Sequence, residues 1–90
     1  MPDRSRRLRI GIRARSRREL LLLTQPALVA ELRKLGWRRC NVAKLSDIEH
    51  GRVDLNLWQE RILAHSLGLT ADALTRPFQK MVPAAEGDRQ

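Results

Sequence analysis

The sequence predicts one compact, all-α domain built from five helices, and three observations support this fold class. Apolar residues make up 42% of the chain and aromatic residues only 3%, with no tyrosine, so the core must be aliphatic. Aliphatic residues recur at helical spacing, and the β-branched residues that favour strands are few. A glycine or a capping residue stands at the expected ends of these segments. Ninety residues leave room for one modest core and no second domain.

The outer segments differ from the body of the chain. Residues 1–9 have no apolar stripe and predict a basic, flexible N-terminal arm. The helical body is expected over residues 10–76 and begins with a helix at 10–23, whose inward face is interrupted by Arg17. Residues 77–90 are expected to form a tail that is partly disordered or takes part in dimer formation, because its end is polar and has no period.

The second helix has clear start and stop signals. Thr24 is the expected N-cap, and Pro26 falls in the first turn, where its missing N–H costs little. Gly36 is the expected stop. The inward stripe between them consists of Leu28, Leu32 and Leu35.

The third helix is expected to follow a short connector at residues 37–40, although these residues are also a possible start of that helix. Asn41 is its expected N-cap and Gly51 its end, with Leu45 and Ile48 facing inward.

The fourth and fifth helices are marked in the same way. Asn56 and Gln59 approximate a capping box, and Gly68 ends the fourth helix. Thr70 is the expected cap of a short fifth helix at 71–75. The inward positions of these two helices are Trp58, Ile62, Leu63, Leu67 and Leu74.

Positive charge is concentrated at the N-terminus. Residues 1–18 contain eight arginines and one acidic residue, Asp3, whereas the rest of the chain carries ten basic and nine acidic residues. Such a cluster suits a polyanion, most often nucleic acid, and a solvated basic tail is the alternative. A basic helix on a membrane surface at residues 4–23 fits less well, because the arginines surround that helix instead of occupying one face.

Cysteine usage and hydropathy predict a cytoplasmic protein without a membrane partner. Cys40 is the only cysteine, so no intramolecular disulfide can form, as in a reducing compartment. We expect no secretory signal, and no segment approaches the roughly 20 apolar residues that span a bilayer.

Two strings carry a resemblance to a known family. The first runs from Arg18 through Thr24-Gln25 to Val29, and the second is Leu45-Ser46-Asp47-Ile48-Glu49-His50-Gly51, continued by Ala64, Leu67-Gly68 and Leu74. In residue type and spacing they resemble the lambda-repressor-like (XRE-type) family of helix-turn-helix DNA-binding domains. The resemblance covers roughly residues 10–74, which is most of the chain. It implies a five-helix fold and a function as a transcription regulator, a repressor, whose third helix enters the major groove.

Three features depart from that family's pattern. Ahead of Leu45 this chain has about six more residues than is usual, which is close to two helical turns. We expect an extra turn on the second helix and a lengthened connection around residues 36–40, with a third helix that starts near Arg38 as the alternative. Leu22 stands where the family favours glycine, and Arg17 stands where it places a core aliphatic residue.

The third helix, residues 41–49, supplies the candidate base-reading residues. A helix fits the major groove, and its exposed N-terminal side chains reach base edges. Because Leu45 and Ile48 face inward, the residues left for the outer surface are Val42, Ala43, Lys44, Ser46 and Asp47. Lysine donates to guanine, serine bonds either way, aspartate accepts from cytosine, and an apolar side chain contacts the thymine methyl.

Phosphate contacts are expected from residues around this helix. Arg38 and Arg39 flank the turn, and Asn41 either bonds a phosphate or only caps the helix. The family uses the positions that match Gln25 and Arg52 on the DNA backbone, so the resemblance implies that role here. The arginines of the N-terminal arm are expected to follow the backbone or enter the minor groove, and they are Arg4, Arg6, Arg7 and Arg9.

The expected partner is double-stranded DNA with a palindromic operator, bound by a homodimer. The protein is expected to be associated with the nucleoid of a prokaryote or to be encoded by a phage. One short helix buries too little surface for strong specificity, so we expect two copies to pair. The candidate pairing surface consists of Trp58, Leu74, Phe78, Met81 and Val82. The alternative function is an antitoxin-type or other protein-interaction module that binds a protein partner through residues 77–90 and uses its DNA-binding domain for autoregulation.

Several other residues are expected to be structural. Glu49 is assigned an internal ion pair or hydrogen bond, Trp58 a packing role, and Cys40 a half-buried structural role in preference to a redox-sensing one. His50 and His65 are isolated, and with one cysteine no zinc-like spacing exists, so we expect no metal site. The sequence has no phosphate-binding loop and no catalytic motif, so we expect neither enzymatic activity nor a cofactor.

Overall fold

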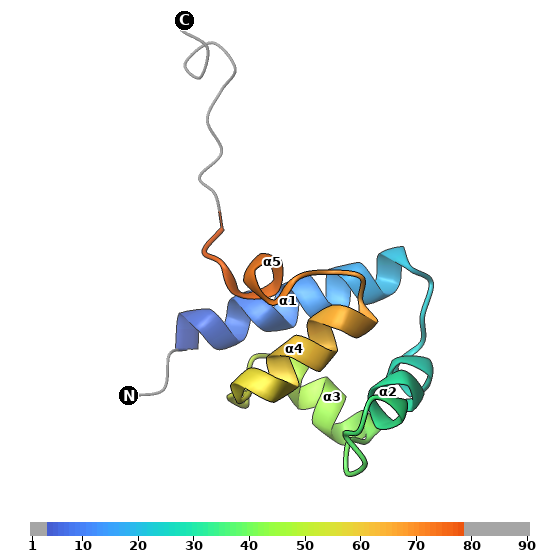
Figure 1. Ribbon diagram of the computed structural model, residues 1–90. Coiled ribbons are helices and arrows are strands. Elements are labelled where there is room, and N and C mark those ends of the chain that lie inside the picture. The colour runs from blue at the N-terminus through green and yellow to red at the C-terminus, as the bar shows by residue number, and fades with distance from the viewer. Residues whose placement is uncertain (1–3, 79–90) are drawn as a thin grey trace, which may run out of the picture.

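The computed structural model describes residues 4–78, which form five α-helices and, within that range, no strand (Figure 1). The helices are α1 (Arg4–Leu20), α2 (Gln25–Lys34), α3 (Val42–Glu49), α4 (Leu57–Ser66) and α5 (Ala71–Thr75). The predicted all-α, five-helix class is therefore confirmed for this part of the chain. None of the helices in it combines the length and the hydropathy needed to cross a bilayer.

The helix ends confirm the capping predictions. Four side chains each accept the backbone N–H three residues further on, and they belong to Thr24, Asn41, Asn56 and Thr70. Asn56 and Gln59 complete a reciprocal capping box. Three glycines reverse the chain after helices with positive φ angles of 112°, 71° and 72°, namely Gly36, Gly51 and Gly68.

The first helix begins earlier than expected, at Arg4. The prediction of a flexible arm is therefore wrong for residues 4–9, and residues 1–3 lie outside the described range. These first turns bury little apolar surface, which is why no stripe is visible in the sequence. Leu8 lies against Gly51, and the arginines of this segment bond to carboxylates and backbone carbonyls of the helical body.

The core is aliphatic, as predicted, apart from Trp37 and Cys40, and it draws on every helix. Its buried members are Ile10, Ala14, Leu28, Val29, Leu32, Trp37, Cys40, Leu45, Ile48, Leu63, Ala64, Leu67 and Leu74. Two expected core positions are wrong, because Leu35 is 38% exposed and Trp58 is 48% exposed. Leu35 lies beyond the end of α2, where the chain turns outward at Gly36. Leu74 is fully buried, so it cannot belong to the pairing surface that the sequence suggested.

The connection between α2 and α3, residues 35–41, is held at several points. Trp37 and Cys40 both enter the core, so Cys40 is more deeply buried than expected. The Nε atom of Arg33 also donates to the Cys40 carbonyl oxygen at 2.7 Å. The third helix starts at Val42, which rules out the earlier start near Arg38. Residues 35–41 therefore form an anchored connection between α2 and α3.

Candidate nucleic-acid interface

The third helix has one buried face and one outward face. Leu45, Ile48 and Glu49 are buried, whereas Val42, Ala43 and Lys44 are exposed and Ser46 and Asp47 are partly exposed. All five predicted base-reading residues therefore reach the surface.

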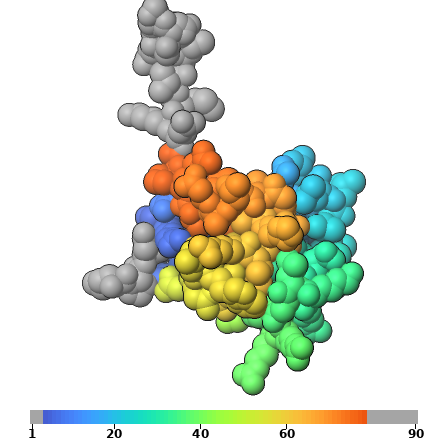
Figure 2. All heavy atoms as spheres, in the orientation of Figure 1, coloured from blue at the N-terminus to red at the C-terminus, as the bar shows by residue number. Residues whose placement is uncertain are grey.

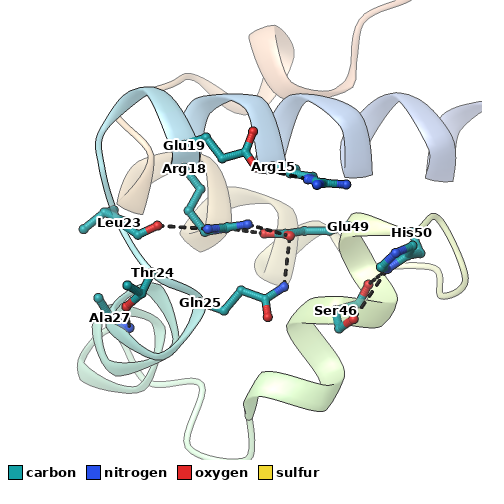
Figure 3. A network of polar contacts seen from close by, with 10 residues as sticks. All are labelled: Arg15, Arg18, Glu19, Leu23, Thr24, Gln25, Ala27, Ser46, Glu49 and His50. Carbon is teal, nitrogen blue, oxygen red and sulfur yellow. Dashed lines mark hydrogen bonds and ion pairs between the residues drawn. The ribbon is translucent and has the colours of Figure 1, made fainter.

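Sequence reasoning missed one residue of this outward face. His50 follows Ala43 by seven positions and Ser46 by four, the spacing that places side chains on one side of a helix. It is exposed, and its Nδ1 atom lies 2.7 Å from the Ser46 carbonyl oxygen. Figure 3 shows Ser46 in α3 and His50 side by side, where His50 directly follows the helix. This spacing is visible in the sequence and is the signal that identifies His50 as part of the outward face.

A buried polar network fixes the inner face of α3 (Figure 3). The Nε atom of Arg18 donates to Oε2 of Glu49 at 2.7 Å, and its Nη2 atom donates to Oε1 at 3.1 Å. The side chains of Arg18 and Glu49 are only 12% and 2% exposed. A third bond runs from Nη1 of Arg18 to the carbonyl oxygen of Leu23, just beyond α1, at 2.9 Å. The predicted internal role of Glu49 is confirmed.

Gln25 completes this network from the start of α2. Its Nε2 atom donates to Oε1 of Glu49 at 3.0 Å, so one carboxylate joins α1, α2 and α3. The hydrogen bond to Glu49 raises the pKa of Arg18, against the opposing effect of burial. Gln25 was expected to contact phosphate. Its side-chain NH₂ group, which would donate such a bond, already donates to Glu49 within the protein.

The arginines of α1 serve the fold to a degree that the sequence does not reveal. Arg6 pairs with the buried Glu60 at 2.7 Å, Arg7 donates to the Gly51 carbonyl oxygen at 3.1 Å, and Arg9 donates to that of Thr75 at 3.3 Å. Carbonyls at the ends of helices have no partner within the helix, and cations there also interact favourably with the helix dipole.

These contacts locate the start of α1 relative to α3. Arg7 and Leu8 lie beside Gly51, at the C-terminal end of α3 and away from its N-terminal turn. Of the four arginines expected to hold phosphate, three have partners within the protein, and Arg4 is exposed. The N-terminal charge cluster therefore does not form a free arm beside the outward N-terminal turn of α3.

A different set of cations surrounds that turn. Arg38, Arg39 and Lys44 are exposed, and their side chains donate to no carboxylate within residues 4–78. The connection that carries the two arginines projects at the lower edge of the molecule (Figures 1 and 2). Asn41 accepts the Lys44 N–H at 2.7 Å, so its capping role is confirmed.

Acidic charge on the outward face of α3 is partly balanced. Asp47 lies 3.4 Å from Nη1 of Arg52, and both side chains are largely exposed. A solvent-exposed pair of this kind contributes little stability, so each partner remains available to another ligand.

Cys40 is chemically quiet in this setting. Its side chain is fully buried, and this burial raises the pKa of the thiol despite the nearby charges of Arg33 and Lys44. Within the described residues no three histidine, cysteine, aspartate or glutamate side chains gather as metal ligands would.

No protein-family model, curated protein or solved structure matches this chain. Its own residues and their arrangement therefore carry the functional assignment.

Proposed function

We propose that this chain is a sequence-specific, double-stranded-DNA-binding transcription regulator, a repressor of the lambda-repressor-like helix-turn-helix class. In this proposal α2 and α3 are the two helices of the motif, and α3 reads the major groove. The observation that supports this proposal is the outward polar face of α3. The opposite face of the helix is fixed by the core and by the bonds of Arg18 and Gln25 to Glu49. A reading helix must keep its side chains in register with base edges, which a fixed platform provides.

The positions of the family-like residues support this assignment. Arg18, Gln25 and Glu49 come from the two strings that resemble the family, and they meet around one carboxylate. The departures from the family pattern are also accommodated. Arg17, in place of a core aliphatic residue, donates from Nε to the Leu67 carbonyl oxygen at the end of α4 at 2.8 Å.

Base contacts are assigned to Val42, Ala43, Lys44, Ser46 and Asp47, with His50 added at the far end of the same face. Phosphate contacts are assigned to the exposed cations beside α3, which are Arg38, Arg39 and Arg52, with the free groups of Asn41 and Gln25 as minor contributors. Each phosphate neutralised by a basic side chain steepens the dependence of log affinity on log salt by about 0.9. A few such contacts therefore predict binding that weakens strongly as salt is added.

Homodimer formation is part of the proposal, because one eight-residue helix contacts few base pairs. Trp58 remains a candidate for the pairing surface, because it is 48% exposed, whereas Phe78, which is 53% exposed, lines a hollow beside α1. Met81 and Val82 lie outside the described residues.

Selection from random-sequence duplexes, performed on the purified full chain, tests this function. We expect an enriched palindromic consensus with half-site centres about one helical turn apart, 10–10.5 base pairs. Competition by the selected duplex should greatly exceed competition by a shuffled duplex or by single-stranded DNA. Enrichment of no sequence would contradict the proposed function.

A further inference from the structure

The outward face of α1 carries apolar side chains that no helix in residues 4–78 covers. Ile12 and Leu20 are 51% and 69% exposed, and Leu8 is 39% exposed. Ile12, Ser16 and Leu20 follow one another at intervals of four and so form a single stripe. The opposite side of α1 is the one that packs on α3, because Gly11 faces the carbonyl oxygens of Ile48 and Glu49. The stripe therefore points away from α3.

Two shallow hollows border this stripe. One lies between α1 and α5 and is walled by Leu20, Leu69 and Ala73. The other lies between the first half of α1 and the segment after α5, and it is walled by Leu8, Ile12 and Phe78. Both are lined mainly by apolar surface, so the face is indented at positions where a partner could seat apolar side chains.

The same face has an excess of positive charge. Arg9, Arg13 and Arg17 line the two hollows, and Arg13 contacts Arg76. The acidic side chains of Asp72 and Glu19 are each paired at 3.2 Å, with Arg76 and Arg15 respectively, so they leave the other three arginines unneutralised. Hydrogen bonds from these arginines to carbonyl oxygens, such as those of Arg13 to Leu74 and Arg76, leave their formal charge uncompensated. Burial and the neighbouring charges of Arg76 and Arg9 lower the pKa of Arg13, as expected where cations crowd together.

We propose that the α1–α5 face, defined by Leu8, Ile12, Ser16, Leu20, Ala73 and Phe78, is a docking surface for an acidic amphipathic segment of another protein. Apolar side chains of that segment would fill the two hollows, and its carboxylates would face the arginines on either side. This mode of recognition resembles a helix laid in a groove, with anchors at intervals of three and four residues.

Charge and shape favour an acidic amphipathic segment over two other possible occupants, a second copy of this chain and an anionic membrane. A second copy of this chain would bring the same arginines into the interface, and like charges facing each other oppose association. A flat anionic membrane would satisfy the arginines but would not fill the hollows. Figure 1 shows α5 on the upper side of the molecule and the α2–α3 connection on the lower side, so such a partner would leave α3 exposed.

A titration of the isotope-labelled full chain with a synthetic amphipathic helix tests the proposal. The probe carries leucines along one face and glutamates on its flanks. We expect saturable shifts in the amide signals of Ile12, Ser16, Leu20 and Ala73, and no comparable shifts in α3. The same helix with lysines in place of the glutamates should bind at least ~10-fold more weakly, a difference of about 1.4 kcal/mol.

Variants separate docking at this face from general attraction. Ile12→Glu and Leu20→Glu should each weaken probe binding at least ~10-fold. Leu22→Glu is the matched control, because it changes the net charge equally at a side chain that is 90% exposed and off the stripe. It should weaken binding less than ~3-fold. Since the replaced side chains are exposed, thermal unfolding should show that all three variants remain folded.

Three results would overturn the proposal. One is the absence of localised shifts with the acidic helix. Another is binding of anionic lipid vesicles, lost in Ile12→Glu, without binding of the helix, which would identify a membrane-surface role. The third is a dimer in sedimentation that Ile12→Glu dissociates, which would identify a second copy as the occupant. None of these results bears on binding of duplex DNA by α3.

Discussion

Most arginines of α1 have hydrogen-bond partners within the protein. Their side chains donate to carbonyl oxygens at helix ends and to buried carboxylates, so they are not held free for a polyanion. Arg17 bonds the end of α4, and Arg9 bonds the end of α5. Charge counts cannot distinguish these roles, because both kinds of arginine carry the same formal charge. Their long-range field remains positive, but their positions are set by packing.

Gly11 is another residue whose role depends on its neighbours. A Cβ atom at this position would lie 2.5 Å from the Ile48 carbonyl oxygen and 2.7 Å from that of Glu49. Gly→Ala in a helix ordinarily stabilises by roughly 0.5–1 kcal/mol. Here Gly11→Ala must push α1 away from α3, at a cost of about 1–3 kcal/mol. We therefore expect the free energy of unfolding to fall in urea denaturation.

The control for Gly11→Ala is Ser16→Ala, which lies on the outward side of the same helix. It should leave stability unchanged or slightly increased, by less than about 0.5 kcal/mol. A gain in stability for Gly11→Ala would show that α1 and α3 are not in such close contact.

The reactivity of Cys40 and its effect on stability are expected to depend on pH. Because burial raises the pKa of its thiol, the thiolate fraction at neutral pH is smaller than in an exposed cysteine. The folded state binds the thiol proton more tightly. The protonated Cys40 thiol therefore favours the folded state at every pH below the pKa of an unfolded cysteine. This contribution to stability is lost as pH rises through the raised pKa of the folded state. Alkylation by iodoacetamide near pH 8 should be slow in the folded protein and at least ~10-fold faster in urea.

Rapid alkylation of the folded protein at neutral pH would contradict the buried position of Cys40. It would revive the redox-sensing role that the sequence leaves open.

Among the elements, helices and their ends were the most predictable. The caps at Thr24, Asn41 and Asn56 depend on residue type and local spacing, which a sequence displays directly. The start of α1 and the exposure of Leu35 and Trp58 were not predictable. They depend on which surfaces meet in three dimensions, such as Leu8 against Gly51.

The site was predictable to a similar extent. The outward residues of α3 follow from its period, and the internal role of Glu49 was expected. The engagement of Gln25 with Glu49 and of Arg6 with Glu60 was not, because each pairing joins residues far apart in the chain.

The turn after α1 contains a non-glycine residue in the left-handed region. Leu22 follows α1 with a φ of +59°. This left-handed region is unfavourable for residues other than glycine. The side chain of Leu22 is 90% exposed, so it meets no neighbour in this conformation. A glycine at this position would adopt the same φ without steric cost.

The contact of α1 and α2 with α3 through Glu49 should dominate the stability of this arrangement. Glu49→Gln keeps the shape of the side chain but leaves Arg18 buried without a carboxylate. Removal of one partner of a buried ion pair typically costs about 3–5 kcal/mol. We expect a loss near the lower limit, about 3 kcal/mol, because the glutamine can still accept one hydrogen bond.

The control is Glu19→Gln, which breaks the exposed Arg15–Glu19 pair in α1 by the same chemical change. It should alter the free energy of unfolding by no more than about 0.5 kcal/mol. Equal effects of the two substitutions in urea denaturation would show that the network around Glu49 does not hold α3 in place.

At the scale of the whole molecule, α1 separates two functional surfaces in our account. One side of α1 supports α3 and its outward face, and the other side carries the apolar stripe and its arginines. This separation would let a regulator bind DNA and a protein partner at the same time.

Reading of DNA by α3 can be tested by a binding titration of one triple variant. Lys44, Ser46 and Asp47 are replaced together by alanine, and affinity for the selected duplex is measured against a shuffled duplex. The matched control replaces Lys34, Ser16 and Asp54, which are the same residue types on exposed surfaces outside α3.

We expect the α3 variant to lose at least ~100-fold of its preference for the selected duplex, since each good base contact contributes about 1–3 kcal/mol of discrimination. The control should keep its preference within ~3-fold. If the α3 variant is folded and retains full preference for the selected duplex, α3 is not the helix that reads the bases.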